Sequence, residues 1–420
     1  MSKKLNVPSV WALAAGGMVG GGIYTVLGVV IASSAQWAWL GFLITGFIAL
    51  PSAYSYASLS NVFSKGGGAF SFLEGVNDQK TGGNIAWLLI IGYVLTISVY
   101  SYAFGHYLSF AFHGGPLMTR LLAAGIMAAL IVLNLSGVGK MTTVEVIIVS
   151  SNLLILLALG ILGLVHWDTH QLTAGVTPKP FWTAFIGGAA IFMAYEGFQL
   201  LTYEYDKISN PKKIFVPTIV SAVIFVIITY IVVTLGAVML GGAFDLVQYK
   251  EIALSIAAKK QLGSTGLIVM TLAAGFATTA AINSTLYSTA SLSNHISEKG
   301  ELPLWFEHKN KNGIPDRSVI LIGSLAALMA VVGSLSSLVE AASVVFLITF
   351  STVNYLAYKK LKQRRWIPVV GLIAAAFIGL ALLFRLVITK PGAFGGLLFI
   401  ALLVILGRPY LLKIMGKQNH

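Results

Sequence analysis

The sequence predicts an all-α membrane protein with twelve transmembrane helices, arranged as two inverted repeats of five spans followed by two additional helices. Three observations lead to this fold class. The chain of 420 residues is 57% hydrophobic and only 10% charged, a balance typical of membrane proteins. Twelve apolar stretches are long enough to cross a bilayer. Two of these stretches are interrupted at matching points in the two halves of the chain, as in membrane proteins built from inverted repeats.

The twelve predicted spans form a single transmembrane domain over residues 1–415. Residues 9–166 make up the first five-helix repeat, 181–358 the inverted second repeat, and 367–412 the two extra helices. Because about 20 residues cross the hydrocarbon core, we expect spans at 9–32, 36–60, 83–112, 118–136, 143–166, 181–203, 214–240, 263–294, 318–333, 337–358, 367–388 and 393–412. The loops between these spans are too short to separate soluble domains.

The first span is interrupted by five glycines within the eight residues that end at Ile23. Broken backbone at membrane depth survives only where it is buried in protein or lines a cavity. The amides freed at Gly20, Gly21 and Gly22 begin a half-helix, whose positive dipole end suits a carboxylate group. The carbonyl of Met18 is expected to accept a hydrogen bond from an ammonium group. The alternative is that the glycines only permit close packing of helices.

The sixth span is interrupted at Tyr195, Glu196 and Gly197, and Glu196 is the strongest candidate for a functional residue in the chain. An acid at membrane depth is costly and marks a functional site by default. Because burial disfavours the charged form of a carboxyl group, Glu196 is a candidate proton carrier. Two other roles remain open: recognition of a cationic ligand group, and stabilisation of the broken helix by accepting backbone hydrogen bonds.

Other polar residues lie inside predicted spans. Thr278 and Thr279 in the eighth span and Asn152 in the fifth are candidate ligands of a coupling ion, with ordinary interhelical or back-bonded hydrogen bonds as the alternative. Tyr93 in the third span is a candidate wall of a binding cavity, with packing as the alternative. The histidines show no metal-ligand spacing and the chain has no cysteine, so we expect no metal site and no cofactor.

The positive charges are distributed unevenly along the predicted topology. Seven of the 27 Lys and Arg residues fall on the outer side if the N-terminus is cytoplasmic, and the other twenty fall on the inner side. This positive-inside asymmetry predicts that both termini are cytoplasmic. The formal net charge of +13 then reflects membrane orientation, and we expect no nucleic-acid partner. The outer seven are Arg120, Lys179, Lys250, Lys259, Lys260, Arg385 and Lys390.

Four motifs occur in one order along the chain. Residues 19–24 (V-G-G-G-I-Y) resemble an I-G-x-G-I-F signature, and residues 195–198 (Y-E-G-F) resemble an unwound sixth helix. Residues 210–217 resemble an N-P-x-x-x-x-P segment with one extra residue, and residues 299–303 (K-G-E-L-P) resemble a D/K-G-x-L-P segment. Through these motifs the chain resembles the amino acid–polyamine–organocation (APC) superfamily over nearly its whole length. The resemblance implies the LeuT-like five-plus-five inverted repeat with helices 1 and 6 broken.

The chain departs from the family pattern at several places. Gly21 stands where members often carry a small hydroxyl residue, and Gln199 stands where an acid is common. Phe70 and Phe72 replace the usual tyrosines after the second helix. Asn152 occupies the position of a lysine that replaces a sodium ion in some proton-coupled relatives. These differences leave the coupling ion open.

The resemblance implies a secondary active transporter, not an enzyme. We expect a permease of the inner (plasma) membrane that moves an amino acid or related amine by alternating access, coupled to protons in preference to sodium. A potassium-like cation carrier and an amino acid exchanger on the same fold are the alternatives. An HExxH motif, a Ser/Lys dyad and paired intramembrane acids are all absent from the sequence, which argues against a membrane hydrolase. The expected partners are the small-molecule substrate and membrane lipids, and the sequence leaves the oligomeric state open.

Overall fold

The computed structural model describes residues 4–64, 66–76, 78–137 and 142–416 of the chain. The predicted cytoplasmic residues Lys3, Lys65, Lys140 and Lys417 lie outside this part. Within the described part the chain is helical and has no β-strand, only an isolated parallel bridge between Leu5 and Ile208. The all-α prediction is therefore confirmed.

The first half of the chain contains seven α-helices. Pro8 stands in the first turn of the first helix, and Asn6 caps this helix by accepting a hydrogen bond from the Ser9 amide. The helices are α1 (Val7–Val19), α2 (Gly22–Ser34), α3 (Ala38–Phe63), α4 (Gly68–Glu74), α5 (Gln79–Ala111), α6 (Pro116–Leu135) and α7 (Thr142–Val165). Short 3-10 turns, η1 (Ala35–Trp37) and η2 (Thr169–Leu172), lie in the connections.

The second half begins with a span that is broken into one α-helix and two 3-10 segments: α8 (Thr183–Ala190), η3 (Phe192–Tyr195) and η4 (Phe198–Lys207). It continues with α9 (Pro211–Gly241), α10 (Ala243–Gln248), η5 (Lys250–Ile252), α11 (Ala253–Glu298), η6 (Leu304–Glu307), α12 (Asp316–Val332) and α13 (Leu335–Lys360). The last elements are α14 (Trp366–Thr389), α15 (Pro391–Leu402), the π-helical segment η7 (Leu403–Gly407) and α16 (Arg408–Gly416).

Both predicted interruptions are present as breaks in the helices. The first span divides into α1 and α2 at Gly20 and Gly21, and the sixth leaves α-helical geometry after Ala190. The two parts of the sixth span meet at a bend of 59°. A further interruption lies inside α11 at Gly263, whose φ of 61° is left-handed, and the predicted eighth span begins at this residue.

The structure has fewer clearly membrane-spanning helices than the twelve predicted spans, within the described residues. In the described residues, nine helical stretches are long and apolar enough to cross a membrane, or ten if the bent pair α8 and η3–η4 counts as one span. The stretch Val7–Phe63 covers both of the first two predicted spans, and α12, at the ninth predicted span, has only 17 residues. The count of twelve therefore stays a prediction.

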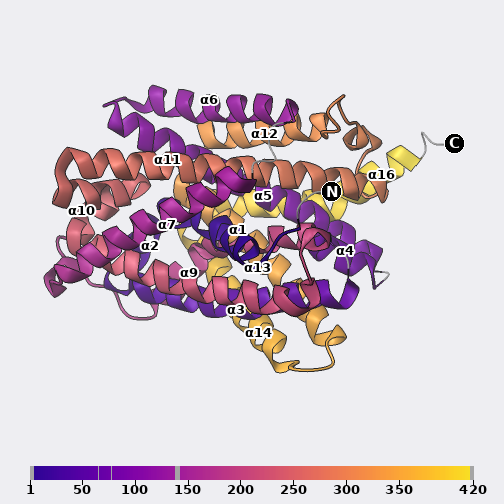
Figure 1. Cartoon of the computed structure of the whole chain (residues 1–420), viewed down its shortest axis with the longest axis horizontal. Coiled ribbons are helices and arrows are strands. Elements are labelled where there is room, and N and C mark those ends of the chain that lie inside the picture. The colour runs from indigo at the N-terminus through magenta and orange to yellow at the C-terminus, as the bar shows by residue number, and fades with distance from the viewer. Residues whose placement is uncertain (1–3, 65, 77, 138–141, 417–420) are drawn as a thin grey trace.

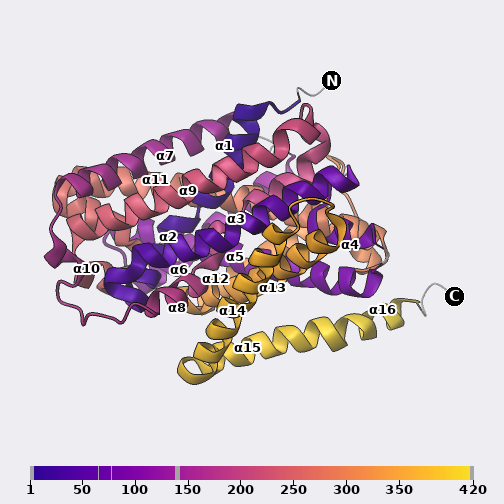
Figure 2. The ribbon, with the colours of Figure 1, turned by 90° about the horizontal axis from the view of Figure 1, so that it is seen from below.

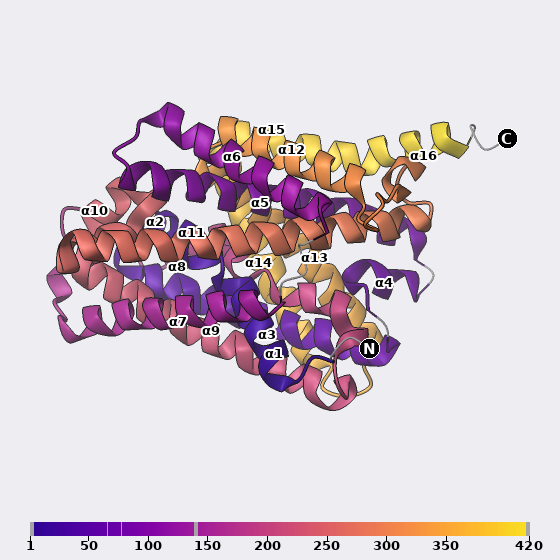
Figure 3. The same ribbon diagram turned by 45° about the horizontal axis from the view of Figure 1, so that its top comes forward.

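The helices pack side by side into one bundle (Figure 1), and equivalent helices of the two halves pair with one another. The second and seventh spans, α3 and α9, pack together, as do the third and eighth, α5 and α11. Figure 3 shows α11 running along nearly the whole bundle. In Figure 2, α4 and α16 lie toward one end of the bundle and α10 toward the opposite end, while α15 and α16 run along its edge.

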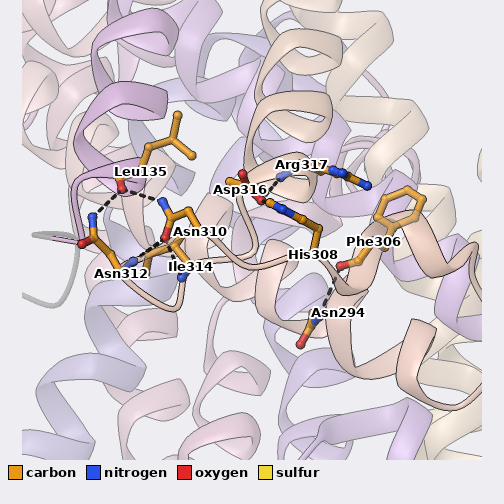
Figure 4. A network of polar contacts seen from close by, with 9 residues as sticks. All are labelled: Leu135, Asn294, Phe306, His308, Asn310, Asn312, Ile314, Asp316 and Arg317. Atoms are coloured by element: carbon orange, nitrogen blue, oxygen red, sulfur yellow. Dashed lines mark hydrogen bonds and ion pairs between the residues drawn. The ribbon is translucent and has the colours of Figure 1, made fainter.

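The loop between α11 and α12 is fixed to the end of α6 by hydrogen bonds (Figure 4). The side-chain amides of Asn310 and Asn312 both donate to the Leu135 carbonyl, at 2.9 and 3.1 Å. The Asn310 side-chain oxygen in turn accepts from the amides of Asn312 and Ile314. This loop is therefore ordered by its own asparagines and is not a free linker.

Candidate functional site

The two broken spans meet at the centre of the bundle, and the residues around the meeting point are buried. Met18 and Tyr195 are inaccessible to solvent, Gly197 is buried, and Glu196 is only 2% exposed. Any side chain on Gly22 would collide with a carbonyl of the other break, because its Cβ would lie 2.8 Å from the Ala194 oxygen. The structure therefore brings together the residues predicted at both breaks.

The amides of Gly21, Gly22 and Ile23 stand at the N-terminal start of α2, and in the described residues the Gly21 amide donates to no backbone carbonyl. Unpaired amides at a helix N-terminus suit an anion. The ring of Tyr100 from α5 covers Gly21 so closely that a Cβ on this glycine would lie 2.2 Å from the Tyr100 Cε1 atom. The absence of a side chain at Gly21 is thus required by a neighbouring aromatic ring.

The opposite side of the meeting point presents carbonyl oxygens. The Tyr230 hydroxyl from α9 lies 2.8 Å from the Met18 carbonyl oxygen and 2.9 Å from the Ala194 carbonyl oxygen, and it donates to them. Met18 belongs to the last turn of α1 and Ala194 to the 3-10 segment of the sixth span. The predicted ammonium acceptor, the Met18 carbonyl, therefore has a hydroxyl partner in this structure.

Glu196 lies among tyrosines and one amide. Its Oε1 accepts a hydrogen bond of 3.2 Å from Gln199, whose other side-chain atom accepts from the Gly197 amide at 2.8 Å. No ion pair is formed by Glu196 within the described part of the chain. Its carboxyl group is near enough to interact electrostatically with the hydroxyls of Tyr56, Tyr93, Tyr100, Tyr203 and Tyr230. A buried carboxyl group without a counter-cation is an arrangement that favours proton exchange or cation binding.

The two predicted tyrosines occupy different environments. The Tyr93 hydroxyl lies 3.5 Å from the Gln199 amide and 3.5 Å from the Tyr203 hydroxyl, so Tyr93 belongs to the polar cluster around Glu196. The Tyr195 hydroxyl donates to the Phe42 carbonyl of α3 at 2.9 Å. Tyr195 therefore anchors the sixth span to α3, and in the described residues it forms no hydrogen bond with the Glu196 side chain.

The predicted coupling-ion residues do not gather in one place. Asn152 lines a small pocket between α1, α7 and α11, together with Ser284 and glycines of the first break, and its side-chain oxygen accepts from the Tyr24 hydroxyl at 3.2 Å. Thr278 and Thr279 do not line this pocket. The Thr278 hydroxyl donates to carbonyls of its own helix, so for this residue the back-bonded alternative describes the geometry.

Three polar residues outside the predicted set of site residues stabilise the breaks. Tyr230 joins the two broken spans, and Gln199 holds the Glu196 side chain, as described above. The Ser343 hydroxyl of α13 donates to the Ala190 carbonyl at 2.8 Å and accepts from the Met193 amide at 3.1 Å, where the sixth span leaves α-helical geometry. Of these, only Gln199 had a sequence signal, since it stands where the family often has an acid.

A second buried acid lies away from the breaks. Glu340 of α13 is 1% exposed, and its carboxylate oxygens lie 3.0 Å from the Arg385 guanidinium and 2.9 Å from the Lys390 ammonium. A cation carrier on this fold would need more acidic ligands than Glu196 alone, but Glu340 is already paired with two cations. Among the described residues, no three His, Asp or Glu side chains gather into a metal site.

Comparisons with known proteins agree with this architecture. A family model described as amino acid permease matches residues 5–407. Over 369 residues the chain is 28% identical to the inner membrane transport protein YbaT of Escherichia coli, with 85% of this chain and 84% of that protein covered. It is 23% identical over 309 residues to the serine/threonine exchanger SteT of Bacillus subtilis, with 72% and 70% covered.

A solved structure shows the same fold. The crystal structure of MhsT in complex with L-phenylalanine matches with a TM-score of 0.63 at 15% identity, covering 90% of this chain and 97% of that one. The predicted LeuT-type fold is therefore confirmed, and the match to the family model extends over nearly the whole chain. The chain is an integral membrane protein and belongs to the amino acid permease family.

Proposed function

We propose that this protein is a secondary transporter that carries an amino acid or related amine across the inner or plasma membrane by alternating access, coupled to protons. The observation that carries the proposal is the meeting of the two breaks. It sets the amides of Gly21, Gly22 and Ile23, at the start of α2, on one side and the carbonyls of Met18 and Ala194 on the other. These are the donors that a carboxylate needs and the acceptors that an ammonium needs.

Glu196 is the proposed proton carrier. Its carboxyl group is buried, and its hydrogen-bond partner Gln199 and the neighbouring tyrosines are neutral groups. Desolvation penalises the charged form of a carboxyl group, so protonation and deprotonation of Glu196 respond to changes in its surroundings during transport. Protons are proposed in preference to sodium, because Glu196 is a buried titratable group at the meeting of the two breaks.

Exchange is the second candidate function, and one observation favours it. The relative SteT is named a serine/threonine exchanger. An exchanger and a proton-coupled permease share the same binding site and differ in whether the empty carrier can change conformation. For both we propose cytoplasmic termini, with α4 and α16 on the cytoplasmic side of the membrane.

Reconstitution of the full chain into proteoliposomes tests the proposal. Vesicles loaded with an unlabelled amino acid are placed in the same radiolabelled amino acid, with L-serine, L-phenylalanine and L-arginine as separate probes. We expect labelled amino acid to enter in exchange for at least one of these probes. Entry no faster than into protein-free vesicles, for these probes and for the remaining common amino acids, would contradict the proposal.

A further inference from the structure

The Tyr230 hydroxyl is the one side-chain group that touches both broken spans through their carbonyl oxygens in the described structure. It lies 2.8 Å from the Met18 oxygen and 2.9 Å from the Ala194 oxygen. We propose that this hydroxyl takes the place of the substrate's ammonium group when the carrier is empty, and so allows the empty carrier to change conformation. The inference rests on the proposed function and concerns how its site behaves without substrate.

The two carbonyls need a donor whether or not substrate is bound. Each stands at the end of a helical segment, α1 or η3, where helix geometry leaves carbonyl groups without intrahelical partners. Both residues are fully buried, so water does not satisfy these oxygens from the surface. A buried carbonyl without a donor costs free energy. The Tyr230 hydroxyl removes this cost in the structure described here.

The hydroxyl lies where an α-ammonium group would arrive. A Cβ on Gly22 would lie 2.5 Å from the Tyr230 oxygen, so this hydroxyl borders the start of α2 at the first break. In an α-amino acid one carbon joins the carboxylate to the ammonium. A carboxylate on the amides of Gly21 to Ile23 therefore places its ammonium beside Tyr230 and the two carbonyls.

An ammonium group is the better donor for this pair of carbonyls. It carries three hydrogens and a positive charge, whereas a tyrosine hydroxyl has a single hydrogen to share between two acceptors. The bound substrate thus replaces the hydroxyl as donor. The Tyr230 ring packs against Phe42 and Tyr195, each with a centroid distance of 5.1 Å, so the hydroxyl returns to the same place when the substrate leaves.

The proposed role of Tyr230 affects exchange and net transport differently. Exchange uses only the loaded carrier, whose carbonyls are satisfied by substrate. Net transport also requires the empty carrier to return, and there the carbonyls depend on Tyr230. Tyr230→Phe is therefore expected to slow net efflux at least tenfold while exchange stays within twofold of the wild type. The dissociation constant of the amino acid is expected to fall at least threefold, because the competing hydroxyl is gone.

Tyr107→Phe is the matched control. The Tyr107 hydroxyl is also fully buried and donates to one carbonyl of α2, that of Tyr24, at 3.0 Å, but it does not join the two breaks. This variant is expected to keep the wild-type ratio of exchange to net efflux. If Tyr230 served only packing or folding, Tyr230→Phe would lower the rates of exchange and net efflux together.

The experiment measures exchange and net efflux of a radiolabelled amino acid from proteoliposomes that hold wild type, Tyr230→Phe or Tyr107→Phe. An unchanged ratio of the two rates in Tyr230→Phe, or an equal fall of both, overturns the inference. If Tyr230→Phe does not fold, wild-type binding of L-alanine is compared with that of N,N-dimethyl-L-alanine, which has one donor hydrogen. Equal affinity for these two overturns the inference, and binding at least tenfold weaker supports it. Absence of any exchange in the wild type would instead reject the proposed function.

Discussion

The backbone of Gly17 in α1 lies directly against the backbone of Gly197 in the sixth-span break. A Cβ on Gly197 would lie 2.3 Å from the carbonyl carbon of Gly17, and a Cβ on Gly17 would lie 3.0 Å from the carbonyl carbon of Gly197. The φ of Gly197 is +127°, a conformation that residues with a side chain rarely adopt. The close approach of the two broken spans therefore depends on glycine at both positions.

Gly197→Ala is expected to destabilise the protein and to abolish amino acid binding. The added methyl group meets backbone atoms, which cannot rotate away, and the left-handed backbone costs a further 1–2 kcal/mol or so. Thermal unfolding in detergent and binding of a radiolabelled amino acid measure the two effects. Gly125→Ala in α6 is the control, because nothing lies within 4 Å of a Cβ there and alanine favours a helix. A Gly197→Ala protein that binds as well as Gly125→Ala would contradict this account.

The stability of the protein is expected to depend on both cations that pair with the buried Glu340. Replacing Arg385 and Lys390 together by Met leaves the carboxylate buried and unpaired, which typically costs about 3–5 kcal/mol. Glu340→Gln should cost less, because the two cations are partly exposed, at 21% and 28%, and can turn toward water. Unfolding free energies in detergent compare the two variants, with the exposed Lys311→Met as control. A smaller loss in the double variant than in Glu340→Gln would be inconsistent with a buried ion pair.

The proposed orientation predicts which loops are accessible from outside. The chain has no cysteine, so a single introduced cysteine reports one position. Thr177 and Lys311 are both exposed and lie in loops on opposite sides of the predicted membrane. In right-side-out vesicles, an impermeant thiol reagent should label Thr177→Cys and should label Lys311→Cys only after the membrane is permeabilised. The reverse pattern would show that the topology is inverted.

The first residue of α12, Asp316, is an acid whose stabilising effect depends on pH. The Asp316 carboxylate lies 2.7 Å from His308 Nδ1 and accepts from the Arg317 amide at 2.9 Å (Figure 4). Partial burial raises the pKa of Asp316, but these hydrogen bonds and the charge of protonated His308 lower it more, so the pKa lies below its usual value.

A carboxyl group with a lowered folded-state pKa stabilises the fold above its unfolded pKa of about 3.9, and this effect disappears as the pH falls through the folded pKa. Asp316→Asn should therefore lower the unfolding free energy at pH 6 by less than about 1 kcal/mol. The difference from the wild type should vanish in more acidic buffer. Thermal unfolding between pH 3 and pH 6 provides the comparison, and a difference that grows on acidification would refute it.

The sequence located both breaks because their cause is local. Glycines inside apolar stretches predict interruptions, and the structure has the interruptions at Gly20–Gly21 and after Ala190. Glu196 belongs to the segment that was predicted as the second break, so the sequence also predicted its position beside that break. The family motifs predicted the LeuT-type fold, and the match to the MhsT structure confirms this fold.

The sequence could not locate contacts that depend on distant parts of the chain. Tyr230 is 212 residues from Met18, and no local pattern marks a tyrosine in an apolar span as a hydrogen-bond donor. Glu340 stands near the end of a predicted span, where an acid is normally solvated, and its partner Arg385 belongs to another helix. The role of Thr278 as an ion ligand stays a prediction, since a helical threonine can also donate its hydroxyl hydrogen to its own backbone, as it does here.

The central claim is proton coupling through Glu196, and accumulation of a radiolabelled amino acid in proteoliposomes tests it most directly. Wild type and Glu196→Gln are compared under an imposed pH gradient, with potassium replacing sodium. Glu204→Gln is the control, because Glu204 lies on the same segment but forms an exposed ion pair with Lys207. Wild type and Glu204→Gln are expected to accumulate the amino acid above its outside concentration, whereas Glu196→Gln should exchange it without accumulating it, because glutamine does not release a proton. Accumulation by Glu196→Gln with the pH dependence of the wild type would contradict the account.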